Sequence, residues 1–344
     1  MTDIVDLRSD TLTRPTPAMR QAMAEAVVGD DVWNEDPTVI ELERRTAEML
    51  GKEAALYVPS GTMSNQVALR SHTEPGEEII TDADAHVYFY EAGAPAALAG
   101  VSCRLAPAQR GIFSADQVRQ LLRPRDVHFT PTKLIWIEQT HNRGGGSIWP
   151  LETIAELSQL AQQQGLRLHM DGARLWNASA ATGISEQRYA QHCDSVSVCF
   201  SKGLGAPVGS AVVGSREFIQ RARRFRKQYG GGMRQAGIIA AGALYALQHH
   251  RQRLAEDHAH ARLLAEGLAA LPGVEVDLEG VQTNIVVFGL KAMPAAQLVD
   301  RAKQQGVLVL CRSPDTIRAV TSLEVGRQGI QRALDVFRTI LSNK

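Results

Sequence analysis

The chain has 344 residues, 44% of them hydrophobic and 22% charged, a composition typical of soluble globular proteins. Its 37 basic residues equal its 37 acidic residues in number, so the sequence does not indicate a basic surface for nucleic acid or acidic lipid. The length is enough for two domains of ~150 residues each. The longest apolar run, 238–247, is too short to cross the ~30 Å hydrocarbon core of a membrane.

The cysteine pattern argues against a zinc site or a redox pair, because no two cysteines have C-x-x-C spacing. The four are Cys103, Cys193, Cys199 and Cys311. A chain of this length does not need disulfides to stabilise its core, so we expect free thiols and no metal site. The first residues also lack the charged-then-apolar pattern of a secretory signal. These features favour a cytoplasmic protein.

The first twenty residues contain two prolines and are expected to form an N-terminal arm, 1–20. The segment 21–245 then alternates short apolar strands with helices, which is typical of a mostly parallel sheet with helices on both faces. Strands are expected at 54–58, 78–81, 101–105, 134–138, 166–171, 195–200 and 211–213. Helices are expected at 37–50, 63–70 and 150–164. The sequence therefore predicts an α/β large domain with a seven-stranded sheet between helices.

The pattern changes after about residue 233. A long helical region runs toward Leu271, where Pro272 and Gly273 break it. Further strands are expected at 274–276, 284–288, 307–310 and 317–321, and helices at 295–304 and 331–341. This arrangement predicts a smaller C-terminal α+β domain over 246–344.

Two charged residues each end an apolar strand and precede a tight turn: Asp171 and Lys202. An acid and a lysine at the C-terminal ends of strands are what a pyridoxal phosphate enzyme needs. The lysine links covalently to the cofactor aldehyde, and the acid keeps the pyridine nitrogen protonated so that the ring can accept electrons from a substrate carbanion. The alternatives are a loop lysine at the surface and a turn or helix-capping aspartate.

Two arginines are candidates for a substrate carboxylate, because a planar guanidinium can donate two parallel hydrogen bonds to it. Arg174 lies three residues after Asp171, and Arg318 falls in an otherwise apolar strand. The alternatives are a surface salt bridge between Arg174 and Asp171, and an exposed strand face for Arg318.

Ser60, Gly61 and Thr62 follow the first strand of the predicted sheet and open a helix, where free backbone N–H groups and the helix dipole bind phosphate. Two histidines are candidates for ring stacking or proton transfer, His86 and His128. A structural or surface role is the alternative for each, and for His128 taken alone it is the favoured one.

Short motifs in the same order along most of the chain resemble those of low-specificity L-threonine aldolases. These are fold-type I pyridoxal phosphate enzymes of the β-eliminating lyase superfamily. The matching segments are 6–11, 28–32, 51–55, 59–62, 140–142, 171–174, 201–205 and 230–235. The resemblance implies a tetramer built from dimers, with each site at a dimer interface.

Residue by residue, the resemblance implies that Lys202 carries the cofactor and that Asp171 faces the pyridine nitrogen. Ser9, Arg174 and Arg318 would bind the substrate carboxylate, with Arg174 close to the cofactor as well. His86 would stack on the ring, and His128 would lie near the substrate hydroxyl. The phosphate would be held by the helix N-terminus and by two basic residues of a neighbouring subunit, in all by Ser60, Gly61, Thr62, Lys227 and Arg234.

Two positions depart from the family pattern. Trp33 stands where members often carry tyrosine, close to the substrate pocket, and Ser322 stands where they often carry histidine. Trp33 therefore bears on the size of the pocket, and Ser322 on a contact behind it. Neither position takes part in the core chemistry that the resemblance implies.

The expected reaction is the retro-aldol cleavage of L-threonine or L-allo-threonine, and of other L-β-hydroxy-α-amino acids, to glycine and an aldehyde. Alternatives on the same scaffold are β-elimination, alanine racemisation, transamination, or a preference for L-phenylserine. A dehydrogenase is disfavoured, because no G-x-G-x-x-G follows an early strand. A non-catalytic protein that keeps the fold is a further alternative. The sequence does not choose between His86, His128 and a bound water as the base.

Overall fold

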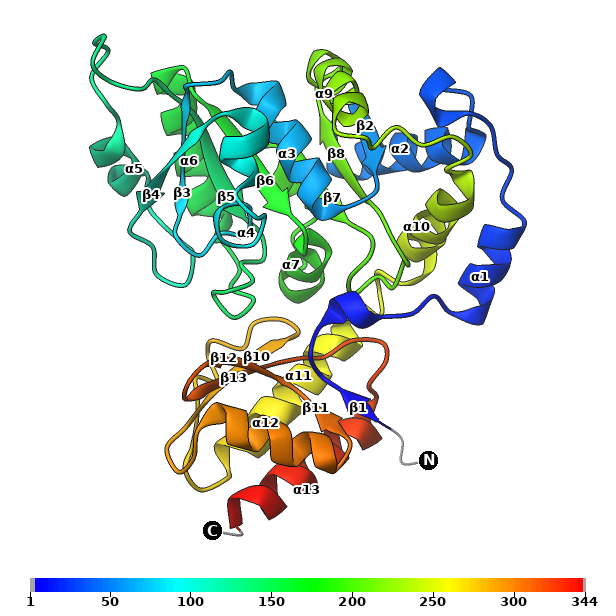
Figure 1. Ribbon diagram of the computed structural model, residues 1–344, viewed down its shortest axis with the longest axis vertical. Helices are drawn as coiled ribbons and strands as arrows, with labels where there is room; N and C mark the ends of the chain where they lie inside the picture. The colour runs from blue at the N-terminus through cyan, green and yellow to red at the C-terminus, as the bar shows by residue number, and fades with distance from the viewer. Residues whose placement is uncertain (1–3, 343–344) are drawn as a thin grey trace.

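The structure, a computed structural model, describes residues 4–342; residues 1–3 of the expected arm and 343–344 of the expected small domain lie outside this range. The described chain forms two lobes, with β1 and α13 both in the lower lobe of Figure 1. The upper lobe contains a seven-stranded sheet with the order β2-β8-β7-β6-β5-β3-β4. The predicted α/β architecture with a second, smaller domain is confirmed.

All seven strands expected for the large domain are present in this sheet. They are β2 (Ala54–Val58), β3 (Glu78–Asp82), β4 (Ser102–Ala106), β5 (Thr132–Glu138), β6 (Arg167–Gly172), β7 (Ser195–Cys199) and β8 (Ser210–Gly214). The pairs β3–β4, β3–β5, β5–β6 and β6–β7 are parallel. Strand β8 is antiparallel to both of its neighbours, β2 and β7. The sheet is therefore mostly parallel, as predicted.

Helices cover both faces of the sheet, and alternate residues of one strand show this directly. In β5, Ile135 and Ile137 join one buried cluster, whereas Leu134 and Trp136 join another. The first cluster includes α2 (Pro37–Leu50), α6 (Leu151–Gln164), α7 (Leu175–Thr182) and α10 (Gly237–His249). The second includes α3 (Gly61–His72) and α9 (Arg216–Gln228). A strand buried on both faces is apolar throughout, which is why these strands stand out in the sequence.

The small domain has a four-stranded antiparallel sheet with the order β12-β13-β10-β9. Its elements are α11 (Leu254–Ala269), β9 (Val274–Val276), β10 (Ile285–Leu290), α12 (Ala295–Gln304), β11 (Val307–Leu308), β12 (Leu310–Ser313), β13 (Thr316–Val320) and α13 (Arg327–Ser342). The prediction of one strand over 307–310 is wrong. The chain changes partner there, because β11 pairs with β1 (Val5–Asp6) whereas β12 pairs with β13.

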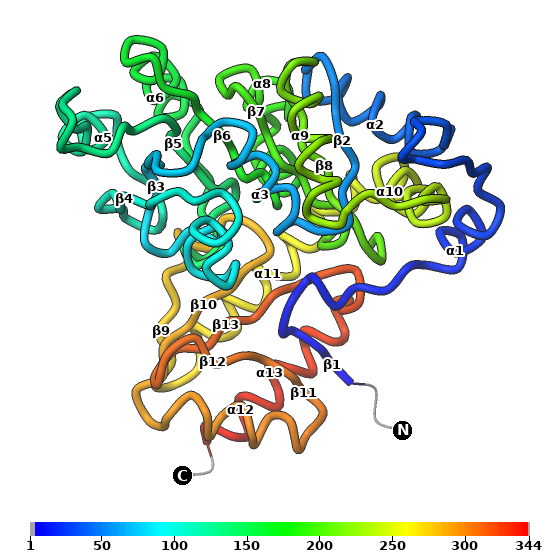
Figure 2. The backbone as a smooth tube through the Cα atoms, turned by 45° about the horizontal axis from the view of Figure 1, so that its top comes forward, coloured from blue at the N-terminus to red at the C-terminus, as the bar shows by residue number. Residues whose placement is uncertain are grey.

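The N-terminal segment begins in the small domain and crosses to the large one. Strands β1 and β11 lie side by side in the lower lobe (Figure 2), and they pair in parallel. Val5 and Leu7 are buried in the core of the small domain. Helix α1 (Pro17–Ala24) then packs against α10 in the large domain. The two lobes have separate buried clusters; Leu254 still belongs to that of the large domain and Ala261 to that of the small one, so our proposed boundary near residue 246 lies several residues before this change.

Two predictions from composition concern the whole chain. No helix in the described range 4–342 is both long and apolar enough to cross a bilayer. The four cysteines are all unpaired, and Cys193 and Cys199 are buried. The expectation of free thiols is confirmed.

Candidate active site

A cavity of about 460 Å³ lies between the two domains, at the carboxyl ends of β5, β6 and β7. Parallel strands bring their C-terminal residues to one edge of a sheet, where polar side chains from several strands meet. The cavity brings together seven of the predicted site residues: Ser9, Gly61, His86, Asp171, Arg174, Lys202 and Arg318.

Asp171 and Lys202 come from neighbouring parallel strands, since Asp171 lies in β6 and Lys202 closely follows β7. Asp171 Oδ2 accepts a hydrogen bond from Asn65 Nδ2 at 2.7 Å, and Oδ1 accepts one from the Ala173 N–H at 3.1 Å. A carboxylate has further acceptor sites, so Asp171 can take another donor from the cavity. Within residues 4–342, the Lys202 amine has no hydrogen-bond or ion-pair partner.

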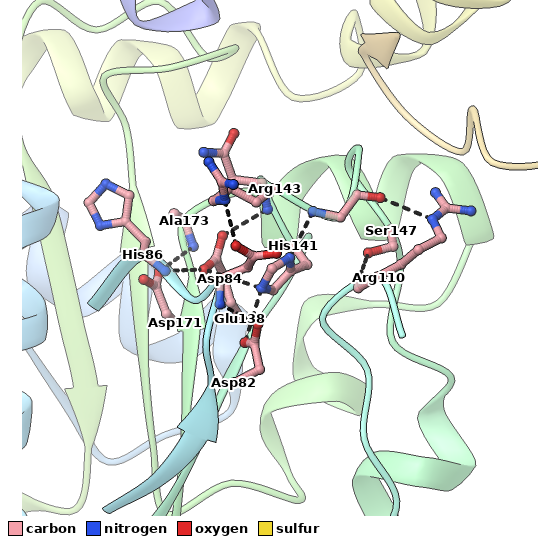
Figure 3. A network of polar contacts seen from close by, with 12 residues as sticks. Asp82, Asp84, His86, Arg110, Glu138, His141, Arg143, Ser147, Asp171 and Ala173 are labelled. Atoms are coloured by element: carbon pink, nitrogen blue, oxygen red, sulfur yellow. Dashed lines mark hydrogen bonds and ion pairs between the residues drawn. The ribbon is translucent and has the colours of Figure 1, made fainter. Parts of the chain in front are cut away.

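His86 stands beside Asp171, and the two are drawn together in Figure 3. Its Nδ1 lies 2.8 Å from Glu91 Oε1, and its backbone N–H donates to Glu138 Oε2 at 2.6 Å. Burial opposes protonation of the ring, but the Glu91 hydrogen bond and the charges of Asp171 and Glu138 outweigh it and raise the pKa of His86. His86 therefore holds its proton to higher pH than an exposed histidine.

The first turn of α3 offers a phosphate cradle. Ser60 caps the helix, since its Oγ accepts a hydrogen bond from the Met63 N–H at 3.1 Å. The N–H groups of Gly61 and Thr62 have no acceptor in the described part of the chain, as expected for the start of a helix. A Cβ at position 61 would lie 3.0 Å from Cys199 Sγ, so glycine keeps this turn open. The arrangement fits a bound phosphate.

The Nε–Nη2 side of the Arg174 guanidinium is paired within the protein and is not open to a ligand. Its Nε and Nη2 donate to Asp10 at 2.8 Å and 2.7 Å, and both side chains are buried. The salt bridge with Asp171, weighed above as an alternative, is not formed; Asp10 takes its place. Among the described residues Nη1 of Arg174 has no acceptor, so its two N–H groups are left for the cavity.

Arg318 reaches the cavity from β13 in the small domain. Its Nη2 donates to Asn142 Oδ1 at 2.8 Å and its Nη1 to the Arg8 carbonyl at 3.2 Å. Its Nε is buried and has no hydrogen-bond partner in the described range. Burial and the Arg174 charge lower the pKa of Arg318 to about 10, so it stays protonated at neutral pH. Arg318 thus presents a protonated guanidinium at the cavity wall, where its charge can attract a ligand carboxylate.

A polar network that the sequence analysis missed supports these residues (Figure 3). Glu138, at the end of β5, accepts hydrogen bonds from the backbone N–H groups of His86 and of Asn142, at 2.6 Å and 2.8 Å. It thus ties His86 to the residue that holds Arg318. Glu91 also went unnoticed, although it accepts from two buried amides, Asn65 and Gln66, at 2.7 Å and 2.6 Å. Glu138 could have been predicted as a site residue from the sequence, because it ends an apolar strand as Asp171 does.

Six predicted residues do not line the cavity of the single chain. Ser60 and Thr62 flank Gly61 at the start of α3. The His128 side chain is 81% exposed on a loop, where its Nδ1 lies 2.5 Å from Asp126. The other three lie together on another exposed surface, where the backbone of 30–34 contacts that of 230–234: Trp33, Lys227 and Arg234.

A family model described as "Beta-eliminating lyase" matches residues 6–290. The chain belongs to the beta-eliminating lyase family. It is 43% identical over 340 residues to the low specificity L-threonine aldolase of Escherichia coli K12, covering 98% of this chain and 100% of that one. It is 41% identical over 341 residues to low-specificity L-threonine aldolase 1 of Arabidopsis thaliana, covering 97% and 95% of the two chains.

Solved structures agree with the fold of this beta-eliminating lyase. The threonine aldolase of Leishmania major matches with a TM-score of 0.84 at 20% identity, over 98% of this chain and 99% of that one. The serine palmitoyltransferase of Sphingomonas wittichii matches with a TM-score of 0.75 at 20% identity, over 98% and 86%. At this identity the likeness concerns the fold alone. The resemblance to low-specificity L-threonine aldolases, drawn from short motifs, is confirmed by the curated relatives.

Proposed function

We propose that this protein is a pyridoxal phosphate-dependent aldolase that cleaves L-threonine and L-allo-threonine to glycine and acetaldehyde. Other L-β-hydroxy-α-amino acids would give glycine and the corresponding aldehyde, so the protein would act in threonine breakdown and glycine formation. The observation that carries the proposal is the meeting of Lys202, Asp171 and two arginines, Arg174 and Arg318, in one cavity. The curated relatives that carry this name cover nearly the whole chain.

The residues present fit the cofactor. Lys202 would hold its aldehyde covalently, and Asp171 would accept a hydrogen bond from the protonated ring nitrogen. The free N–H groups of Gly61 and Thr62 would bind the phosphate, and the His86 ring would stack on the pyridine. When bound, pyridoxal phosphate supplies an electron sink for the pair released as the Cα–Cβ bond breaks.

The chain's own groups would bind the substrate and move one proton. Arg174 Nη1 would donate to the α-carboxylate, the Arg318 guanidinium would attract it, and Ser9 lines the same cavity. Fixing the carboxylate sets the orientation of the Cα–Cβ bond, which is a large part of catalysis by positioning. His86 is the histidine that lines the cavity of the single chain, so we propose it, directly or through a water, as the base for the β-hydroxyl.

Replacing His86 with phenylalanine tests this role, because the ring is kept and the proton acceptor is lost. We expect kcat for L-threonine to fall by ~10²–10⁴-fold, the usual contribution of general acid–base catalysis. The raised pKa of His86 places the acid limb of wild-type kcat/KM above pH ~6.5. Glu91→Gln removes the carboxylate beside His86 and should move that limb to lower pH. An unchanged limb in both variants would assign the base to another group.

We propose that the exposed residues of the predicted set act across a subunit interface in a tetramer built from dimers. Lys227, Arg234 and Trp33 are exposed, and Val27 and Val28, a few positions before Trp33 in the chain, are 69% and 40% exposed. Basic residues on an apolar exposed surface suit a partner's cofactor phosphate. The four free cysteines support a reducing, cytoplasmic location.

The function is tested by incubating the holoenzyme with L-threonine, L-allo-threonine or L-phenylserine, and measuring glycine and the aldehyde. Equal amounts of glycine and aldehyde support the proposal, and the ratio of kcat/KM values gives the substrate preference. Ammonia and a keto acid would indicate β-elimination, and D-alanine formed from L-alanine would indicate racemisation. Either result without glycine would contradict the aldolase assignment.

A further inference from the structure

The segment 7–13, here called the N-terminal strap, contacts both arginines of the proposed carboxylate site and the backbone of Lys202. The Arg8 carbonyl accepts a hydrogen bond from Arg318 Nη1 at 3.2 Å. Asp10 accepts two from Arg174. Thr13 Oγ1 donates to the Lys202 carbonyl at 2.9 Å. A stretch that the sequence analysis treated as an arm thus touches two arginines and the lysine.

Asp10 is the buried charge in this strap. Its side chain is fully buried, and besides Arg174 it accepts a hydrogen bond from Asn284 Nδ2 of the small domain at 3.1 Å. Burial alone would favour the neutral acid, but the charges of Arg174, Lys202 and Arg318 outweigh it and hold the pKa of Asp10 below its usual range. A buried ion pair adds little to stability compared with apolar packing, so its presence beside the cavity calls for another reason.

The geometry of the pair supplies that reason. Bidentate pairing with Asp10 fixes the plane of the Arg174 guanidinium and uses both Nε and Nη2. Nη1 is then the donor that remains, in a fixed position on the cavity wall. The Asp10 charge also offsets one of the two guanidinium charges.

We propose that Asp10 is a positioning residue for the substrate carboxylate, acting through Arg174. This inference rests on the proposed function, because it takes amino acids as the ligands. It differs from a structural role in one respect: the effect of Asp10 on ligand binding must depend on the presence of Arg174. A double-mutant cycle measures that dependence.

The experiment measures glycine binding to holoenzyme by isothermal titration calorimetry. Asp10→Asn keeps the size of the side chain but loses one acceptor and the charge, so we expect the glycine Kd to rise roughly tenfold or more. In the Arg174→Gln background the same change should alter Kd by less than about twofold. Asp335→Asn is the matched control, because Asp335 pairs with Arg338 at 2.7 Å on an exposed face of α13 and does not line the cavity. The control should leave Kd unchanged.

The proposal is overturned if Asp10→Asn leaves glycine binding within twofold, strengthens it, or weakens it by the same factor with and without Arg174. If Asp10→Asn gives no holoenzyme, Asn284→Ser removes the small-domain contact of Asp10, together with the Asn284 hydrogen bond to the Thr321 carbonyl. That variant should still weaken glycine binding in the wild-type background and not in Arg174→Gln. Wild-type holoenzyme that binds neither glycine nor L-threonine would instead defeat the proposed function, so the two failures are distinguishable.

Discussion

Lys202→Ala is expected to lower the turnover of L-threonine by more than ~10⁴-fold, above the range for loss of a general base. Lys202 is the sole lysine among the described residues that line the cavity, so no other amine stands ready to take its place. The loss should be largest in kcat, because the arginines that would bind the carboxylate remain.

Borohydride reduction followed by mass spectrometry checks the same assignment without measuring activity. Wild-type protein should carry the reduced cofactor on the peptide that contains Lys202, and Lys202→Ala should carry none. Lys133→Ala serves as the control, because Lys133 is 45% exposed at the start of β5 and does not line the cavity. If Lys202→Ala kept near-normal turnover and borohydride still attached the cofactor to this variant, the assignment of Lys202 would be wrong.

Arg318→Gln is expected to lower kcat/KM for L-threonine by roughly 30- to 4,000-fold, which corresponds to the ~2–5 kcal/mol lost when one partner of a buried charge pair is removed. The largely buried, protonated guanidinium on the cavity wall is the reason to expect an effect of this size. Arg318→Lys should recover only part of the loss, because an ammonium group keeps the charge but not the planar fork.

The measurement is steady-state kinetics together with the thermal midpoint of each variant. Arg262→Gln is the control in the same domain, since Arg262 is 49% exposed on α11 and pairs with Glu266. It should leave both kcat and KM unchanged. If Arg318→Gln kept the wild-type KM and kcat while folding normally, the carboxylate would have to bind elsewhere.

The large domain was predictable because its strands are buried on both faces and therefore read as short apolar runs. Helix α2 was predictable to the residue, because Asp36 caps it and Gly51 ends it in the left-handed conformation. The break within the strand expected at 307–310 could not be predicted, because β11 pairs with β1, about three hundred positions away in the sequence. A local pattern cannot reveal a change of partner over that distance.

Within the site, the local sequence pattern alone was enough to predict that Asp171 and Lys202 meet, because each is a charged residue at the end of an apolar strand. Trp33 could be named only by resemblance, and His128 taken alone was interpreted as a structural or surface residue, because no local pattern shows which surface a neighbouring subunit covers. Asp10 was missed, because an aspartate among polar neighbours looks exposed. Its burial depends on Arg174, 164 positions later in the chain.

The pairing of β1 with β11 has a mechanical consequence. The backbone passes between the lobes twice, once after residue 13 on the way to α1 and once between α10 and α11. A body attached at two points can swing about the line through them, but it resists twisting about any other axis. Any opening of the cavity should therefore follow a single hinge direction, with Arg318 on the swinging lobe and Lys202 on the stationary one.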